Sequence, residues 1–226
     1  EIFLAHPELL TDLSKGILTS KLGSLYYFIN DDRTRKTLAE SLEILRGQNL
    51  DHLSAEERSR LARSLVHVGA VYTELRLDQE AKTLLEKAVD IYEKEKVRNY
   101  TDLSWALTQL GNVHRRGGKY EKARDYLEET VHLNNFYEVD QKRMARTFAY
   151  LGSVYRSLGL YQNAIDTLEE GLTLYKKNYS SDHFRVGWIL MQLGNMYRRL
   201  GNYEKSINYL QQSLKIHQKH FDENHI

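Results

Sequence analysis

"LGNVHRRGGKYEKA" at residues 110–123 occurs again as "LGNMYRRLGNYEKS" at residues 193–206. A looser copy, "LGSVYRSLGLYQNA", lies between them at residues 151–164. The residues of an enzyme active site usually occur once in a chain, whereas a repeated phrase is typical of a structural unit that is stacked along the chain. The three copies therefore predict a repeat protein.

The copies belong to a longer register that is marked by glycines. Gly69, Gly111, Gly152 and Gly194 are separated by 42, 41 and 42 residues. Apolar residues lie four and one positions before each glycine, and Tyr or His lies three positions after it; these offsets mark one face of a helix. A small residue follows each glycine after twelve positions and a leucine after sixteen: Ala81 and Leu85, Ala123 and Leu127, Ala164 and Leu168, Ser206 and Leu210.

The second half of each repeat has the same helical spacing, and short breaks such as "GGK" and "LGN" separate the two halves. Each repeat is therefore predicted to be a hairpin of two helices. Glycine inside a helix costs about 1 kcal/mol relative to alanine, so its recurrence predicts that the partner helix packs closely at that point, against the small residue. The expected helices span residues 59–75, 78–95, 101–116, 120–135, 142–157, 161–177, 184–199 and 203–219.

This combination of Leu-Gly, an aromatic residue three positions later and a small residue twelve positions later resembles the tetratricopeptide repeat. That family repeats every 34 residues, often with a proline at the end of the second helix, whereas this chain repeats about every 42 residues and has one proline. The longer unit is similar to the extended repeats of kinesin light chains. The resemblance covers residues 60–226 and implies an all-α fold, a right-handed superhelical solenoid of antiparallel helix hairpins.

A degenerate repeat precedes the regular ones. Leu22, Gly23 and Tyr26 stand in the same relation as their later counterparts, but Gly23 lies 46 residues before Gly69. In the longer link that follows, Ser54 is a candidate helix cap before Glu57. The expected division is residues 1–57 as a degenerate N-terminal repeat or cap, followed by four repeats at about 58–99, 100–140, 141–182 and 183–226.

Composition limits the classes of function. The 226 residues are 41% apolar and 28% charged, which is typical of a folded soluble protein. The net charge of +1 disfavours nucleic acid and anionic membranes as general partners. The chain has no cysteine, and its first residues lack the pattern of a signal peptide. These features predict a cytoplasmic protein, and the missing initiator Met indicates an excerpt of a longer polypeptide.

No motif for catalysis, cofactor binding or metal binding is present. The sequence lacks a phosphate-binding glycine loop, HExxH spacing and a nucleophile elbow. His217, His220 and His225 lack the further ligands that a metal site requires, and His114 takes the place of a packing tyrosine. Glutamates of the second helices, such as Glu128 and Glu169, are interpreted as solvated. The chain is therefore expected not to be an enzyme and to need no cofactor.

A binding function is expected at first-helix positions that the core leaves free: six and three residues before each glycine, and one, four and five after it. By the tetratricopeptide resemblance, this face lines a concave groove, here basic with polar and aromatic spots. Alternatively, the arginines only solubilise the surface, and the tryptophans pack against the preceding repeat. The candidate peptide-binding residues are Trp105, Thr108, Asn112, Arg115, Arg116, Arg146, Ser153, Arg156, Trp188, Met191, Asn195, Arg198 and Arg199.

The leading hypothesis is a protein-interaction module whose groove binds an extended or helical acidic peptide of a partner protein. Arg115, Arg156 and Arg198 occupy equivalent positions and would form a basic ladder. One alternative is the regulatory or substrate-recruiting region of a larger enzyme or signalling ATPase. RNA binding through Arg and aromatic residues is a further alternative, which the near-neutral charge disfavours. A clamp for chaperone tails is disfavoured because Val66 and Ala70 replace the polar residues that such clamps use.

Overall fold

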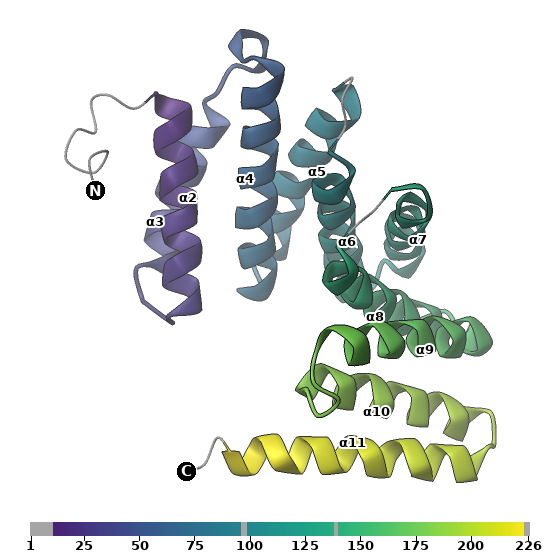
Figure 1. Cartoon of the computed structure of the whole chain (residues 1–226). Coiled ribbons are helices and arrows are strands. Elements are labelled where there is room, and N and C mark those ends of the chain that lie inside the picture. Colours follow the sequence, from purple (N-terminus) through teal and green to yellow (C-terminus); the bar gives the residue numbers. More distant parts are fainter. Residues whose placement is uncertain (1–10, 96–98, 138–139, 224–226) are drawn as a thin grey trace. The chain divides into compact units, whose positions relative to one another are not determined.

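The computed structural model describes residues 11–95, 99–137 and 140–223, with side chains described up to Lys219. Within these ranges the regular structure is helical and no strand is present. Figure 1 shows antiparallel helix pairs, as expected for the predicted all-α fold of helix hairpins. The helices are α2 (Asp12–Phe28), α3 (Thr34–Arg46), α4 (Ala55–Glu74), α5 (Asp78–Lys94), α6 (Tyr100–Arg116), α7 (Tyr120–Phe136), α8 (Gln141–Ser157), α9 (Tyr161–Asn178), α10 (Phe184–Arg199) and α11 (Tyr203–Glu223), with a 3-10 turn, η2, at Leu50–His52.

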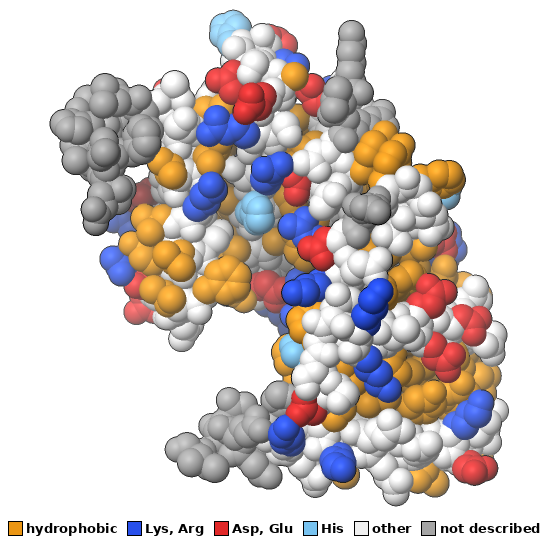
Figure 2. Space-filling view, viewed as in Figure 1, with side chains coloured by type: hydrophobic (Ala, Val, Ile, Leu, Met, Phe, Trp, Pro, Cys, Tyr) orange, Lys and Arg blue, Asp and Glu red, His pale blue; other side chains and the backbone are white. Residues whose placement is uncertain are grey.

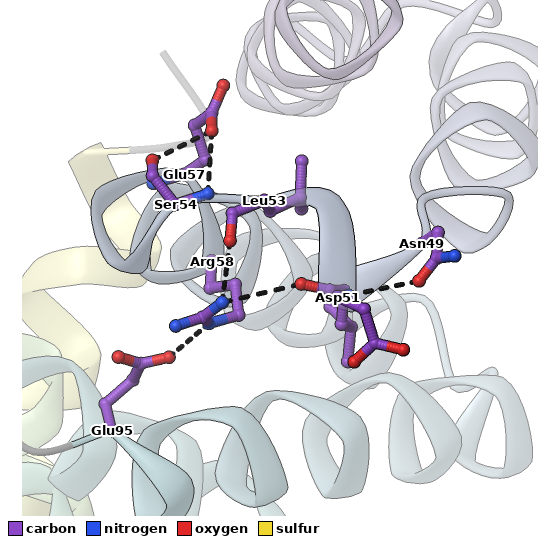
Figure 3. Close-up of polar contacts among 8 residues, drawn as sticks. Asn49, Asp51, Leu53, Ser54, Glu57, Arg58 and Glu95 are labelled. Atoms are coloured by element: carbon purple, nitrogen blue, oxygen red, sulfur yellow. Dashed lines mark hydrogen bonds and ion pairs between the residues drawn. The ribbon is translucent and has the colours of Figure 1, made fainter.

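The first regular helix, α4, begins four residues before the predicted start because Ser54 caps it. The Ser54 hydroxyl accepts the backbone N–H of Glu57 at 3.3 Å, and the Glu57 carboxylate accepts the backbone N–H of Ser54 at 2.9 Å. This reciprocal pair is a capping box (Figure 3), which confirms the predicted cap. The backbone hydrogen bond from Ser54 lowers the pKa of Glu57.

The link between α3 and α4 is held by the next residues of the same helix. Arg58 donates to the carbonyl of Leu53 at 2.6 Å and to the carboxylate of Glu95, just after α5, at 2.5 Å (Figure 3). Within the link, the Asn49 side chain accepts the backbone N–H of Asp51 at 3.0 Å. One guanidinium therefore ties the link to the end of the α4–α5 hairpin.

The chain divides into two compact units, residues 1–113 and 114–226, with the division inside α6. In the first unit, α2 pairs with α3 and α4 with α5. In the second, α8 pairs with α9, α10 pairs with α11, and α7 packs against α8. The core of the second unit joins neighbouring hairpins, because Ile165 and Leu172 of α9 share one apolar cluster with Ile189 and Leu193 of α10. The predicted division into residues 1–57 and four repeats stays a prediction.

The repeated glycines lie where two helices of a hairpin touch. A Cβ atom added to Gly152 would lie 2.5 Å from Cγ of Leu168 and 3.3 Å from the carbonyl oxygen of Ala164. The same contact recurs at Gly69 with Leu85 and at Gly194 with Leu210. Close approach therefore explains the glycines, and the leucine sixteen positions later supplies the nearest atoms.

Each hairpin turn places one residue in the left-handed region, seven positions after the glycine. Gly118, Gly159 and Gly201 have φ between 72° and 78° there, and Arg76 has φ 65°. The backbone N–H of the next residue then bonds to the carbonyl five positions back, as in Leu160 to Tyr155 at 2.9 Å, which is a Schellman cap. Asn30, seven positions after Gly23, has φ 54°, so the degenerate first hairpin uses the same turn.

The glutamates Glu128 and Glu169 of the second helices are exposed, as interpreted from the sequence, and each also accepts a hydrogen bond from a neighbouring hairpin. The Tyr155 hydroxyl donates to Glu128 at 2.7 Å, and the Tyr197 hydroxyl donates to Glu169 at 3.2 Å. Each bond joins the first helix of one hairpin to the second helix of the preceding one. Helical spacing alone could not reveal this contact, because it depends on the neighbouring repeat.

Candidate functional site

Three of the predicted binding residues are almost completely covered. Thr108, Asn112 and Ser153 lie among the buried polar residues. The hydroxyl of Thr108 donates to the carbonyl of Ser104, one turn earlier in the same helix, at 2.8 Å. A ligand on the surface could not reach these side chains, so their predicted contact with a peptide backbone has no support and they are removed from the candidate site.

The other predicted residues keep exposed surface. Trp105 belongs to the unit of residues 1–113, and the rest belong to the unit of residues 114–226. The candidate site is therefore built within the second unit. Arg198 and Arg199 are exposed, and the half-buried members are Trp105, Arg115, Arg116, Arg146, Arg156, Trp188, Met191 and Asn195.

Arginines from consecutive first helices come close to one another. The guanidinium carbon of Arg115 lies 5.2 Å from the ring centroid of Tyr150 in α8. Burial lowers the pKa of Arg115, and the charges of Arg116 and Arg156 lower it further. The Nε of Arg156 is itself buried and has no hydrogen-bond partner within the described part of the chain. These three cations form a basic cluster that is partly removed from water.

Next to this basic cluster, α8, α9, α10 and α11 enclose a pocket of about 230 Å³. Two of its lining residues, Arg146 and Trp188, were predicted binding residues, and Trp188 also packs against the core. Tyr150 lines the pocket as well, so one ring joins the pocket to the basic cluster. Ala149, which occupies one of the predicted first-helix positions, lines the pocket too, and the remaining lining residues, which the sequence did not indicate, are Tyr175, Phe184, Arg185 and His217.

Two arginines, Arg146 and Arg185, line this pocket together with aromatic side chains. Burial raises the pKa of Tyr175, and the positive charges of Arg185 and Arg146 act against that rise. Both arginines line the pocket together with Tyr175. The guanidinium carbon of Arg185 also lies 5.2 Å from the ring centroid of Phe184. A cavity of this size and chemistry suits one anionic side chain with an apolar stem.

One signal in the sequence could have revealed the pocket. Tyr150 lies two positions before its glycine, where the neighbouring repeats have Gln109 and Gln192. An aromatic residue at a position that is polar elsewhere departs from the repeat pattern. Tyr175 and Arg185 come from the end of α9 and the start of α10, and the first-helix periodicity alone does not mark those residues.

The unit of residues 1–113 has its own pocket, of about 420 Å³, between α2 and α4. Its lining includes Arg63, which lies six residues before its repeat glycine and so occupies the same repeat position as Arg146 and Trp188 of the second unit. Arg63 donates to the carboxylate of Asp102 at 2.6 Å, so part of its charge is neutralised within the fold. Exposed Leu25 and Phe28 make this pocket more apolar than basic.

No helix within the described ranges has both the length and the apolar character needed to span a membrane. Among the described residues, no three potential ligands of a metal ion gather in one place. His217 is exposed, and the side chains of His220 and His225 lie outside the described residues.

The family comparison agrees with this architecture. A family model described as tetratricopeptide repeat matches residues 60–133 and 143–219. No curated protein matches the chain as a sequence relative.

Several solved structures have a similar fold. BtubC (BKLC) from P. vanneervenii has 17% identity over 89% of this chain and 79% of its own, with a TM-score of 0.69. A P. anserina protein, described as a kinesin light chain with nearly identical TPR-like repeats, has 20% identity over 94% of this chain and 99% of its own, with a TM-score of 0.66.

A Rap protein solved in complex with competence and sporulation factor has 18% identity and a TM-score of 0.71. The match covers 97% of this chain but 58% of the Rap chain. At these identities the likeness shows the fold alone. Because the family model covers more than half of the sequence, the chain belongs to the tetratricopeptide repeat family, whose repeats serve as protein-interaction scaffolds.

Proposed function

We propose that this chain binds an acidic peptide segment of a partner protein on the first-helix face of residues 114–226. The observation that carries the proposal is the position of Tyr150. Its ring lies under Arg115 and also lines the pocket that holds Arg146. An acidic side chain in the pocket and another against the basic cluster could therefore belong to one short peptide.

The electrostatics of this face favour an anionic ligand. The pKa of Arg115 is lowered by burial and by its like-charged neighbours, so the ionised cluster is held at a cost in free energy. A carboxylate bound there offsets that cost. An exposed ion pair contributes only about 0–1 kcal/mol, but a hydrogen bond to a charged group in a partly desolvated site contributes about 1.5–3 kcal/mol. Several such contacts on one peptide combine.

The exposed end of α10 extends the basic face. Arg199 donates to the Tyr161 hydroxyl at 3.4 Å and lies over that ring, which leaves its charge at the surface. Arg198 is exposed next to it, and Asn195 is half-buried one turn earlier. In the proposal, these residues contact the peptide beyond the pocket, and Arg198 completes the ladder with Arg115 and Arg156.

Binding of labelled peptides tests the proposal. Short fluorescent peptides rich in Asp and Glu are compared by anisotropy with the same peptides carrying Asn and Gln. The acidic peptides should bind more tightly, and their affinity should fall as salt is raised. The variant Arg146→Gln/Arg185→Gln should weaken binding at least about tenfold, equivalent to about 1.4 kcal/mol.

The matched control removes the same charge elsewhere. Lys176 and Lys177 are exposed on α9 and line no described pocket, so Lys176→Gln/Lys177→Gln should retain the affinity of the unchanged protein. Equal affinities for acidic and amide peptides would contradict the proposal. Tight, salt-dependent binding of single-stranded RNA that the acidic peptides do not displace would favour the nucleic-acid alternative.

A further inference from the structure

The pocket between α8, α9, α10 and α11 has walls that supply positive charge and no negative charge. Arg146 and Arg185 line it, and none of its eight lining residues is acidic. Phe184 and Arg185 form the first turn of α10, so the positive end of that helix lies at the same pocket. On the face seen in Figure 2, Lys and Arg side chains lie among apolar side chains over the helices α8 to α10. The pocket therefore favours a ligand group with more than one negative charge.

The polar groups of this pocket come from four different helices. Arg146 lies on α8, Tyr175 on α9, Arg185 on α10 and His217 on α11. A carboxylate is planar, and a single guanidinium can occupy both of its oxygens. A phosphate monoester is tetrahedral, carries a charge of about −1.5 to −2 at pH 7 and has three acceptor oxygens. It can therefore accept hydrogen bonds from several walls at once.

A departure from the repeat pattern holds His217 in the wall of the pocket. Gly187 stands seven residues before its repeat glycine, where the preceding repeat has Ala145. A Cβ atom added to Gly187 would lie 2.6 Å from both Cε1 and Nδ1 of His217, so the imidazole rests against the backbone of α10. The Ser213 hydroxyl, one turn earlier on α11, donates to the carbonyl of Gly187 at 2.7 Å. The missing side chain of Gly187 thus seats a ring that can donate a hydrogen bond to a ligand.

Aromatic rings form much of the remaining wall. Tyr150, Phe184 and Trp188 line the pocket, and Trp188 also packs against the core. Aromatic side chains pair favourably with a further ring, by offset stacking or edge to face. A ligand group with an aromatic stem gains these contacts, which the short aliphatic stem of phosphoserine cannot make.

We propose that the pocket binds a phosphorylated side chain of the partner peptide, with phosphotyrosine preferred over phosphoserine, so that phosphorylation of the partner controls binding. The inference rests on the proposed peptide binding and adds the chemical identity of the residue in the pocket. Because the ring of Tyr150 lies under Arg115, acidic residues next to the phosphorylated one would meet the basic cluster. An unphosphorylated tyrosine brings the ring without the charge and binds weakly.

Anisotropy with labelled peptides of one acidic sequence tests the inference. The central residue is phosphotyrosine, phosphoserine, Glu or Tyr, and the flanking Asp and Glu residues are the same in all four. The phosphotyrosine peptide should bind at least about tenfold more tightly than the Glu peptide, which corresponds to one additional charge-assisted hydrogen bond. Inorganic phosphate should compete only weakly, because it has no aromatic stem.

Matched variants separate recognition of the phosphate from general attraction between charges. Arg146→Lys/Arg185→Lys keeps both positive charges but loses the planar guanidinium forks, so the preference for phosphotyrosine over Glu should fall by at least about threefold. Gly187→Ala displaces the imidazole and should weaken phosphotyrosine binding as much as His217→Ala does. The control Lys176→Gln/Lys177→Gln, on exposed positions of α9, should retain the full preference. Circular dichroism should show native helix content in every variant.

The outcomes distinguish this inference from the proposed function. Equal affinities of the phosphotyrosine and Glu peptides, with both bound more tightly than an amide peptide, would overturn the inference and leave acidic-peptide binding intact. Absence of binding by all acidic peptides would contradict both. A phosphotyrosine preference that survives in folded Arg146→Gln/Arg185→Gln would place the phosphate elsewhere and overturn the inference. Equal affinities of phosphoserine and phosphotyrosine would refute the role of the rings, and competition by inorganic phosphate as strong as that by phosphopeptide would indicate a site for the free anion.

Discussion

Replacing Gly152 by alanine should destabilise the α8–α9 hairpin, although the same change would stabilise an isolated helix. Intrinsic helix propensity favours alanine over glycine by about 1 kcal/mol. In the structure, the new Cβ would lie 2.5 Å from Cγ and 2.7 Å from Cδ2 of Leu168. Leu168 is fully buried, so its side chain cannot turn outward to make room.

Packing outweighs propensity at this position. Adding a methyl group to a well-packed core costs about 1–3 kcal/mol, and the carbonyl oxygen of Ala164 at 3.3 Å limits how far the helices can shift. Because the 2.5 Å approach is far inside normal contact, we take the upper part of this range, about 2–3 kcal/mol, and expect a net loss on the order of 1–2 kcal/mol after the gain of about 1 kcal/mol in propensity. For a chain of this size, each 1 kcal/mol lowers the melting temperature by about 2–4 °C.

Thermal melting followed by circular dichroism measures the effect. The control is Gly47→Ala, because the atoms nearest to its added Cβ are 3.7 Å away, and its melting temperature should hold or rise. Leu168→Ala alone should cost about 2–5 kcal/mol. In that background, Gly152→Ala should become neutral or stabilising, since the cavity accepts the methyl group. An unchanged melting temperature for Gly152→Ala, or an equal loss in both backgrounds, would refute the packing argument.

Three further predictions concern stability. Ser54→Ala removes the capping box and should cost about 0.5–2 kcal/mol in urea unfolding, whereas an equal loss in a Glu57→Ala background would contradict the reciprocal cap. Tyr155→Phe should cost about 0.5–1.5 kcal/mol, and a double-mutant cycle with Glu128→Ala should show coupling; additive effects would exclude the hydrogen bond. Burial and the charge of Glu169 raise the pKa of Tyr197 from 10.0 to about 12. The folded state therefore holds the Tyr197 hydroxyl proton more tightly than the unfolded state does. The stability that this adds is present below pH 10 and is lost as the pH rises from 10 to about 12. The urea midpoint of Tyr197→Phe should therefore fall less across this range than that of the unchanged chain.

The fold followed from periodicity because the same helical faces recur in the sequence. Gly69, Gly152 and Gly194 mark helix contacts that the structure shows at one phase, and the predicted breaks coincide with the left-handed residues Gly159 and Gly201. The boundary between the two compact units, which falls inside α6, was not predictable, because the repeat spacing is nearly constant at that point of the sequence.

The candidate site was predictable only in part, because the position of a residue along its helix does not show whether the neighbouring repeat covers its side chain. Ser153 and Asn195 occupy equivalent positions, yet Ser153 is buried and Asn195 keeps partial exposure. The pocket combines Arg146 with Tyr175 and Arg185, which come from three helices. Periodicity on one helix identifies the first of these residues and has no information on the other two.

Selection of ligands from a random peptide library tests the central claim most directly. The immobilised chain is compared with Arg115→Gln/Arg156→Gln/Arg198→Gln and with a control of equal charge change, Lys122→Gln/Lys176→Gln/Lys215→Gln, whose lysines are exposed on the second helices. We expect peptides enriched in Asp and Glu from the unchanged chain and from the lysine control, and loss of that enrichment from the folded arginine variant. Recovery of the same acidic peptides by the arginine variant, or no acidic enrichment by the unchanged chain, would contradict the account.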